Sequence, residues 1–377
     1  MKKVYLDYAA TTPLDRDVKK EMDPYFTEKC GNPSSLHSFG QEALFAIDSA
    51  REKVAKFLNA ESREIIFTSS ATEANNLAVF VKEGDHAITS SIEHKAVLEP
   101  LKESGAEISY ISSNKNGVVR ADDVLNEIRE ETVFVSVMYV NSEIGTVQPI
   151  KEIGEKIKEI NEKREKKIIF HTDASQAGNY LSCDVKDLGV DLLTLSGHKI
   201  YGPKGVGVLF IKEGLSISSS TYGASQEKGL SPGTENVPAI VGMGSAVENI
   251  KKSDYKETKR LQDKLIDSIL NDIEGAELNG DREKRIPNNI NISFKGVEGE
   301  SLLIALDREG IAVSTGSACA SNSLSPSYVL LSLGLSHEKA HSSLRISLGR
   351  DTTEEDIDYF LEKLKEIIKK LRIISGR

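Results

Sequence analysis

The 377 residues of this chain, 28% of them charged and 39% hydrophobic, are enough to bury a large core and are expected to form two or three domains. The formal net charge of −10 argues against nucleic acid as the main ligand, because a surface that binds phosphates needs clustered Lys and Arg. No apolar run is long enough to span a bilayer, and the opening MKKVYLDYAATTP lacks the apolar stretch of a secretory signal. The cysteines Cys30, Cys183 and Cys319 share no CxxC spacing, which is typical of reduced thiols in the cytoplasm. We therefore expect a cytoplasmic protein with no metal, no nucleic-acid partner and no membrane segment.

Short apolar runs alternate with helical patterns between residues 63 and 211. The expected strands are Glu64–Thr68, His86–Ser90, Glu107–Ser112, Val133–Val140, Ile168–Asp173, Asp191–Ser196 and Val206–Ile211. The expected helices are Thr72–Lys82, His94–Lys102, Ala121–Arg129 and Ile150–Lys166. The run VFVSVMYV is apolar on both faces, as in a strand that helices cover on both sides. This alternation predicts a large α/β domain with a mostly parallel, seven-stranded sheet flanked by helices.

A change of pattern near residue 250 predicts a second, smaller α+β domain. Ser245–Asp272 is expected to form one long, charged helix that bridges the two domains. After it we expect, in chain order, the strand Asn289–Phe294, the helix Gly299–Arg308, the strands Ile311–Ser314 and Arg345–Leu348, and the helix Thr353–Leu371. The first fifteen residues are expected to return beside these elements. The predicted bounds are 16–250 for the large domain and 1–15 with 251–377 for the small domain.

Polar and ionisable residues follow the expected strands of the large domain, where the ligands of open α/β sheets bind. These segments are Thr68–Glu73, Ser91–His94, Asn141–Gly145, Asp173–Gln176 and Ser196–Lys199. Because parallel strands end at the same edge of a sheet, one pocket could collect all of them.

Three of these segments carry groups that suit one cofactor. Ser70-Ala-Thr-Glu73 is a capping box whose N–H groups could cradle a phosphate or simply start a well-capped helix. Asp173 could pair with the protonated ring nitrogen of a pyridoxal cofactor, or could be a surface or N-cap aspartate, and Gln176 could donate to a phenolate oxygen. Lys199 lies among small residues and suits imine chemistry, whereas a lone lysine is usually a solvated charge. Taken together, these residues predict pyridoxal 5′-phosphate on Lys199.

Three further side chains could take part in chemistry. His94 could stack on a cofactor ring and shuttle a proton, or could hydrogen-bond at a helix start. Cys319 lies in a stretch of small, turn-forming residues that favours a reactive thiol, whereas Cys30 and Cys183 are expected to be structural. Arg345 could take a substrate carboxylate in a bidentate pair, or could form a salt bridge between the domains.

Ten segments in order carry a resemblance to a known family. They are YLDYAATTP, GNPSSLHSFGQEA, ATEANN, EHKAVLEP, NSEIGTVQP, HTDASQ, SGHKIYGPKG, PGTENVPAIVG, GSACAS and AHSSLRISLGR. Together they resemble the cysteine desulfurases of the NifS/IscS type, which are fold-type I (class V aminotransferase-like) pyridoxal enzymes. The resemblance spans nearly the whole chain. It implies removal of sulfur from L-cysteine, which gives L-alanine and a Cys319 persulfide for an acceptor protein in iron–sulfur cluster assembly or thiolation.

The resemblance also implies a role for each site residue. Lys199 would hold the cofactor and move the substrate α-proton, and His94 would stack on the ring and act as an acid–base. Asp173 would pair with the ring nitrogen and Gln176 would contact the ring hydroxyl. The remaining roles would be the cofactor phosphate for Ala71, Thr72, Ser196 and His198, the neighbouring subunit's phosphate for Thr234, the substrate carboxylate for Asn141 and Arg345, and the nucleophile for Cys319. The role of Thr234 implies a homodimer.

Four residues depart from the family pattern. Ser70 and two residues of the 223–234 segment, Ala224 and Ser225, stand where glycine is usual, and Ser231 stands where arginine is common. The first would matter if that position needed a positive φ. The resemblance does not extend to the longer tail with which housekeeping members grip their iron–sulfur scaffold protein, which argues against that particular partner.

Other functions on the same fold remain open from these residues. A selenocysteine lyase would use the same groups, whereas an aminotransferase would not need Cys319. A pyridoxal-binding scaffold of low activity is a third alternative. The acceptor could be an iron–sulfur scaffold, a tRNA-thiolation protein or part of a cofactor pathway.

Overall fold

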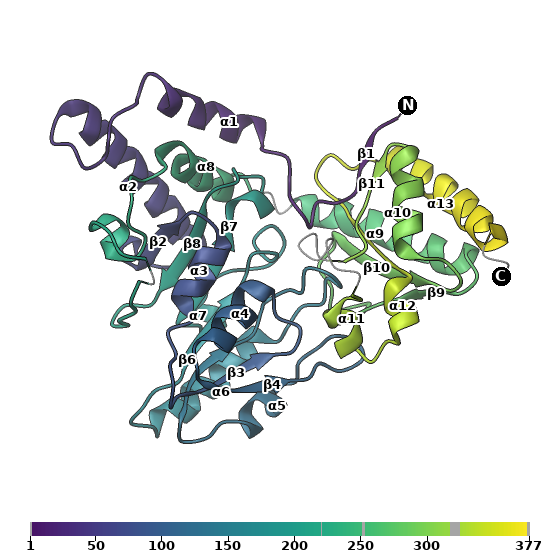
Figure 1. The fold of residues 1–377 in the computed structure, drawn as a ribbon. Coiled ribbons are helices and arrows are strands. Elements are labelled where there is room, and N and C mark those ends of the chain that lie inside the picture. Colours follow the sequence, from purple (N-terminus) through teal and green to yellow (C-terminus); the bar gives the residue numbers. More distant parts are fainter. Residues whose placement is uncertain (1, 220, 251–252, 317–324, 375–377) are drawn as a thin grey trace.

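The fold of the large domain is built around one seven-stranded sheet (Figure 1). A computed structural model describes residues 2–219, 221–250, 253–316 and 325–374. The strands lie in the order β2-β8-β7-β6-β5-β3-β4. β8 is antiparallel to both of its neighbours, β2 and β7, and the other neighbouring strands in this sheet are parallel. Their bounds are β2 Ile65–Thr68, β3 His86–Ser90, β4 Glu107–Ile111, β5 Thr132–Ser136, β6 Ile169–Asp173, β7 Leu192–Ser196 and β8 Gly207–Ile211. The predicted, mostly parallel α/β sheet is confirmed.

Helices cover both faces of this sheet, which explains the continuous apolar runs in its strands. Phe134 and Val135 are neighbours on β5 and both are fully buried, yet they belong to two hydrophobic clusters on opposite faces. The helical elements of this domain are α1 Arg16–Met22, η1 Asp23–Phe26, α2 Ser38–Leu58, η2 Ser62–Glu64, α3 Ala71–Ala78, α4 Lys95–Glu103, α5 Ala121–Asn126, α6 Ile150–Glu162, α7 Val185–Leu188, η3 Gly197–Lys199, η4 Gln226–Gly229 and α8 Val237–Glu248. The helix expected to reach Lys82 ends at Ala78, because Phe80 and Val81 turn into the core beside Phe134.

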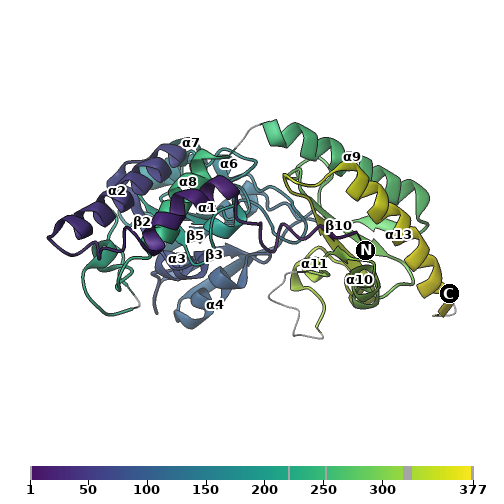
Figure 2. The same cartoon turned by 90° about the horizontal axis from the view of Figure 1, so that it is seen from above.

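A smaller group of elements forms the second hydrophobic core. The sheet β12-β10-β9 is antiparallel, and β1 pairs in parallel with β11. Figure 2 shows α9 and α13 lying side by side along this sheet. The bounds are β1 Val4–Tyr5, α9 Ser253–Asp272, β9 Ala276–Leu278, β10 Asn289–Phe294, α10 Gly299–Arg308, β11 Ile311–Ala312, α11 Tyr328–Ser332, α12 His337–His341, β12 Ser343–Ser347 and α13 Glu354–Ile374. Among the described residues, none of the helices is long and apolar enough to cross a bilayer.

The prediction of a single helix over Ser245–Asp272 is wrong, because α8 ends at Glu248 and a separate helix, α9, begins at Ser253. Asn249 ends α8, and its N–H donates to the carbonyl groups of Ser245 and Ala246. The Asn249 carbonyl accepts a hydrogen bond from Arg350 Nη2 at 3.0 Å, and the same guanidinium lies 4.1 Å from the centre of the Tyr201 ring. Arg350 therefore fixes the point at which the chain passes from one core to the other.

The N-terminal segment contacts both cores. Val4 and Leu6 are buried in the small-domain cluster, whereas the Thr12 N–H donates to the His198 carbonyl of the large domain at 2.9 Å. The domain bounds 16–250 and 1–15 with 251–377 therefore stay a prediction. Two separate hydrophobic clusters support the division itself.

We expect Leu344→Ala to destabilise the fold, because this fully buried side chain of β12 fills the small-domain core. A loss of about 2–5 kcal/mol in the free energy of unfolding is the usual effect of such a cavity. Urea titration followed by circular dichroism measures it. The control is Ile304→Ala on α10, where the side chain is 53% exposed and a change below about 0.5 kcal/mol is expected. Equal losses in the two variants would contradict the placement of Leu344 in a packed core.

Candidate active site

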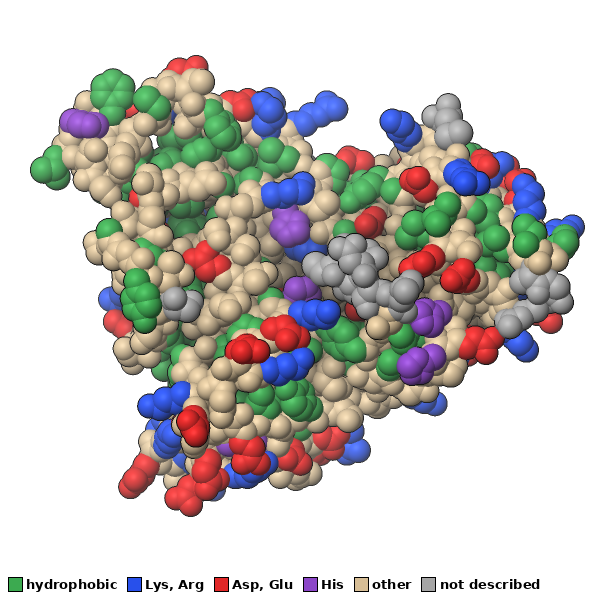
Figure 3. Space-filling model, in the orientation of Figure 1, with side chains coloured by type: hydrophobic (Ala, Val, Ile, Leu, Met, Phe, Trp, Pro, Cys, Tyr) green, Lys and Arg blue, Asp and Glu red, His purple; other side chains and the backbone are tan. Residues whose placement is uncertain are grey.

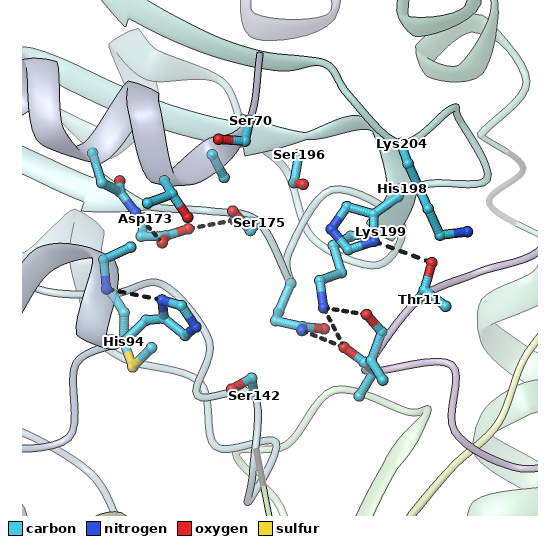
Figure 4. A pocket seen from close by; sticks show the side chains of 18 of the residues that line it. Thr11, Ser70, His94, Ser142, Asp173, Ser175, Ser196, His198, Lys199 and Lys204 are labelled. Carbon is cyan, nitrogen blue, oxygen red and sulfur yellow. Dashed lines mark hydrogen bonds between the residues drawn. The ribbon is translucent and has the colours of Figure 1, made fainter. Parts of the chain in front are cut away.

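A cavity of about 430 Å³ lies at the carboxyl ends of the large-domain strands, beside the small domain (Figure 4). Its walls contain the ends of β6 and β7, the starts of α3 and α4, part of the N-terminal segment and one residue of β12. The structure brings to it these residues singled out from the sequence: Ala71, Thr72, His94, Asp173, Gln176, Ser196, His198, Lys199 and Arg345. Asn141 and Thr234 are not among its lining residues, and Cys319 lies outside the described residues.

The start of α3 presents backbone N–H groups to the cavity. Ser70 caps this helix, its Oγ accepting from the Glu73 N–H at 3.2 Å, and Ala71 and Thr72 follow as lining residues. The first N–H groups of a helix have no partner within it, so they suit an anion. Ser70 has a φ of −170°, an extended backbone that any residue adopts, so serine in place of glycine needs no adjustment. Glycine is needed instead at position 207, where a Cβ would lie 2.4 Å from the Ser70 carbonyl carbon.

Asp173 is a buried carboxylate held in a fixed orientation. Its Oδ2 accepts from Asn75 Nδ2 at 2.7 Å, and its Oδ1 accepts from the Ser175 N–H at 2.9 Å. Asn75 is fully buried and lines the cavity, and sequence reasoning missed it. Its position four residues after Ala71, hence on the same face of α3, was the available signal.

The Lys199 amine lies across the cavity from Asp173 (Figure 4). Its Nζ donates to the carbonyl groups of Ala9 at 2.5 Å and Ala10 at 2.8 Å. Gln176 Nε2 donates to the same Ala9 carbonyl at 3.0 Å. The N-terminal segment therefore forms one wall of the cavity, a role that the sequence did not indicate.

Two histidines line the cavity in different settings. His198 Nδ1 lies 3.1 Å from Thr11 Oγ1, and burial, followed by the charges of Lys199 and Lys204, lowers the pKa of His198 to about 4. This imidazole is therefore neutral near neutral pH. His94 caps α4, its Nδ1 accepting from the Ala96 N–H at 3.1 Å. Lys204 is another lining residue that the sequence did not point to.

Arg345 joins the small domain to the cavity. Its side chain is buried, Nη2 pairs with Asp7 Oδ1 at 2.9 Å, and Nη1 donates to the Ser142 carbonyl at 3.3 Å. Arg345 lines the cavity, as a substrate contact requires, whereas its ion pair is with Asp7 of the predicted small domain and its bond to the large domain is a hydrogen bond to the Ser142 carbonyl. Its Nε is buried and has no hydrogen-bond partner within the part of the chain that the structure describes.

The Asn141 side-chain amide binds backbone groups of its own loop and of the loop between β3 and α4. Its Oδ1 accepts from the Glu143 and Ile144 N–H groups, and its Nδ2 donates to the Ile92 carbonyl. Ser142 is the residue of this loop that lines the cavity. A substrate contact from Asn141 stays a prediction.

Thr234 is exposed on the segment between η4 and α8. An ion pair between the partly buried Arg51 and the buried Glu227 of η4 anchors the start of that segment, with Arg51 Nη2 2.6 Å from Glu227 Oε1. Ser231, which stands where arginine is common in the family, donates from its Oγ to Glu73 Oε1 at 2.6 Å. The segment is therefore held on the large domain by Glu227 and Ser231.

The two described cysteines differ in their surroundings. Cys183 is buried, and burial raises the pKa of its thiol to about 12, as expected for a structural thiol. The expectation of a structural thiol is wrong for Cys30, which is exposed.

Comparison with known proteins gives one consistent result. The family model Aminotransferase class-V matches residues 4–360. A cysteine desulfurase IscS of Clostridium botulinum is 50% identical over an alignment of 388 positions. The alignment covers 99% of this chain and 96% of that protein. The IscS of Methanosarcina thermophila is 48% identical, covering 99% of this chain and 94% of its own length.

Solved structures agree with these relatives. A NifS-like protein superimposes with a TM-score of 0.89 at 36% identity, covering 98% of this chain and 100% of its own. A structure titled SspA in complex with cysteine has a TM-score of 0.82 at 36% identity, with 93% and 100% covered.

The low pKa of His198 predicts a dependence of stability on pH. Between about pH 4 and pH 6.5 the unfolded chain binds a proton at this residue and the folded chain does not, so stability should rise with pH across this window. The contribution is at most about 1.4 kcal/mol per pH unit, and less because His198 is partly exposed. Urea titrations across the window should show a shallower slope for His198→Asn. An unchanged slope would contradict the neutral imidazole.

Proposed function

The chain belongs to the class-V aminotransferase family and, within it, to the cysteine desulfurases of the IscS type, and on this basis we propose that it converts L-cysteine to L-alanine and a Cys319 persulfide. The observation that carries the proposal is the single cavity in which an amine, a carboxylate and imidazoles converge. Identity of 50% over nearly the whole chain to a named cysteine desulfurase supports it.

Pyridoxal 5′-phosphate is the cofactor of this proposal, and the residues present fit it. Glycine at position 207 leaves room against Ser70 for the anion cradle at the start of α3. Asp173 supplies the buried carboxylate for a protonated ring nitrogen, and Lys199 supplies the amine. Proposed contacts of its phosphate are Ala71, Thr72, Ser196 and His198, with His94 stacked on the ring and Gln176 at its hydroxyl. When bound, the cofactor stabilises negative charge that develops at the substrate α-carbon.

The protein's own groups would carry the proton and sulfur transfers. Arg345 would bind the substrate carboxylate, and its buried Nε, unpaired among the described residues, supports this role. Lys199 Nζ would take the α-proton, and His94 would give or take a proton beside it. The Cys319 thiolate would attack the substrate sulfur, so that an S–S bond forms and the Cβ–S bond breaks. The electron pair of the broken bond stays on Cβ, which a proton then converts to the methyl group of L-alanine.

A sulfur-acceptor protein and a cytoplasmic location complete this part of the proposal. The persulfide needs an acceptor thiol or an acceptor protein to restore Cys319. Cys30 and Cys183 are both free thiols, which supports a reducing compartment.

A homodimer is part of the same proposal. Four large apolar side chains near the start of α2 are more than half exposed, namely Phe26, Leu36, Phe39 and Phe45. Figure 3 shows hydrophobic side chains gathered at this end of the molecule, at the upper left. Water-exposed apolar groups of this number favour a covering partner, and a second copy would also bring Thr234 to a neighbouring cavity.

Sedimentation velocity tests the dimer. The wild type should sediment at twice the mass of one chain, and Phe45→Glu should shift it towards single chains, because a charge replaces a side chain that is 75% exposed on α2. Ile304→Glu on α10 is the matched control and should leave the mass unchanged. A monomeric wild type would contradict this part of the proposal.

The reaction itself is tested with L-cysteine and a reductant. We expect equal amounts of sulfide and L-alanine from the cofactor-loaded wild type, and a loss of about a hundredfold or more in Cys319→Ala, because the nucleophile is gone. Cys30→Ala is the matched control, because it also replaces a cysteine with alanine, at an exposed position, and it should keep the wild-type rate.

Lys199→Ala should lose both products together with the visible absorbance of the bound cofactor. A wild type that carries the cofactor and releases neither product would overturn the proposed function. Release of a keto acid without sulfide would identify an aminotransferase instead.

A further inference from the structure

A loop of the large domain is seated in the small domain next to the cavity. This loop, residues 141–145, follows β5, and two asparagines of β10 bind its backbone. Asn289 Nδ2 donates to the Ser142 carbonyl at 2.9 Å, and Asn291 Nδ2 donates to the Glu143 carbonyl at 3.1 Å. The backbone of Glu143 is therefore fixed relative to both domains.

The Glu143 carboxylate accepts a hydrogen bond from a residue that follows Cys319 in the chain and lies near a residue that precedes it. Its Oε2 accepts a hydrogen bond of 2.5 Å from Ser327 Oγ, which follows Cys319 in the chain. A Cβ built on Gly316, which precedes Cys319, would lie 3.6 Å from the same Oε2. Glu143 is only 2% exposed, so this hydroxyl-to-carboxylate bond is shielded from water and stronger than it would be at the surface.

Contacts of the residues that follow Ser327 also join this part of the chain to the large domain. The Tyr328 hydroxyl donates to the Glu93 carbonyl at 2.5 Å, and Glu93 directly precedes His94 in the cavity wall. Beneath these bonds a hydrophobic cluster joins Ile92, Met138 and Ile144 of the large domain to Val329, Leu330 and Leu333 around α11. The end of the chain segment that follows Cys319 is thus docked on the wall that carries His94.

We propose that Glu143 is a positioning residue for the sulfur-transfer step: through its hydrogen bond with Ser327, it fixes the end of the segment that follows Cys319 relative to the cavity. This inference rests on the proposed function, in which the Cys319 thiolate attacks the substrate sulfur. Glu143 is not among the lining residues of the cavity, so it acts through Ser327 and not on the substrate. Loss of a fixed geometry between two reacting groups lowers the rate of their reaction more than it lowers substrate binding.

Single-turnover kinetics with Glu143→Ala test this. The first turnover of L-alanine should slow by about tenfold or more, while the half-saturating L-cysteine concentration for the cofactor absorbance change stays within about twofold. That absorbance change reports substrate binding and does not require Cys319. An alanine rate within about twofold of the wild type would overturn the inference.

Ser327→Ala should slow the same step, and the double variant should be no slower than the slower single variant, because both changes remove the same hydrogen bond between the Ser327 hydroxyl and the Glu143 carboxylate. Ser327 also caps α11, its Oγ accepting from the Leu330 N–H. Ser336→Ala is the matched control, since Ser336 is an exposed serine that caps the next helix, α12, through the Lys339 N–H. It should leave the alanine rate unchanged. Additive losses in the double variant would overturn the shared role of Glu143 and Ser327.

Hydrogen exchange separates failure of this inference from failure of the proposed function. Amide exchange in a peptide covering residues 325–335 should rise in Glu143→Ala and stay at the wild-type level in Ser336→Ala. If the wild type forms no alanine, the proposed function fails, and the exchange result alone decides whether Glu143 holds this segment. Unchanged exchange in Glu143→Ala would overturn the inference in either case.

Discussion

The parallel direction of β3, β5, β6 and β7 is the constraint on which the rest of the molecule depends. Because these strands end at one edge of the sheet, the segments that follow them meet there. Burial on both faces keeps the strands in register, and a slip of one residue would turn the apolar side chains of β5 to the wrong faces. The positions of His94, Asp173 and Lys199 are therefore consequences of core packing some distance below them.

Hydrogen bonds to nearby groups orient the ionisable side chains of the cavity. Asp173 is oriented by an amide from α3 and by a backbone N–H, whereas the Lys199 amine is oriented by carbonyl groups of the N-terminal segment. His198 lies near two lysines and stays neutral. A carboxylate, an amine and a neutral imidazole thus lie within one small volume, each with hydrogen-bond partners of its own.

The small domain contributes by its connections as much as by its own residues. Arg350 holds the point where the chain crosses between the cores, and the β10 asparagines hold the loop that follows β5. Arg345 reaches the cavity because these contacts hold the two domains together, and its guanidinium donates to the Ser142 carbonyl of the large domain. The same contacts between the domains bring Glu143 to Ser327. The geometry of the cavity and the anchoring of the Cys319 sequence therefore depend on one set of contacts.

The sequence by itself determined the order of strands and helices, the polar segments at the strand ends and the family, because apolar periodicity and short motifs are local properties. It also placed Asn289–Phe294 and Gly299–Arg308 at their observed bounds. It could not show that Asn75 orients Asp173, that Ala9 and Ala10 hold Lys199, or that the Asn141 amide binds backbone groups of two loops. It also missed the break between α8 and α9, where the Asn249 carbonyl accepts a hydrogen bond from Arg350, about a hundred residues further along the chain. Only the tertiary structure decided these points, because each includes a hydrogen bond between residues that are far apart in the sequence and that packing brings together.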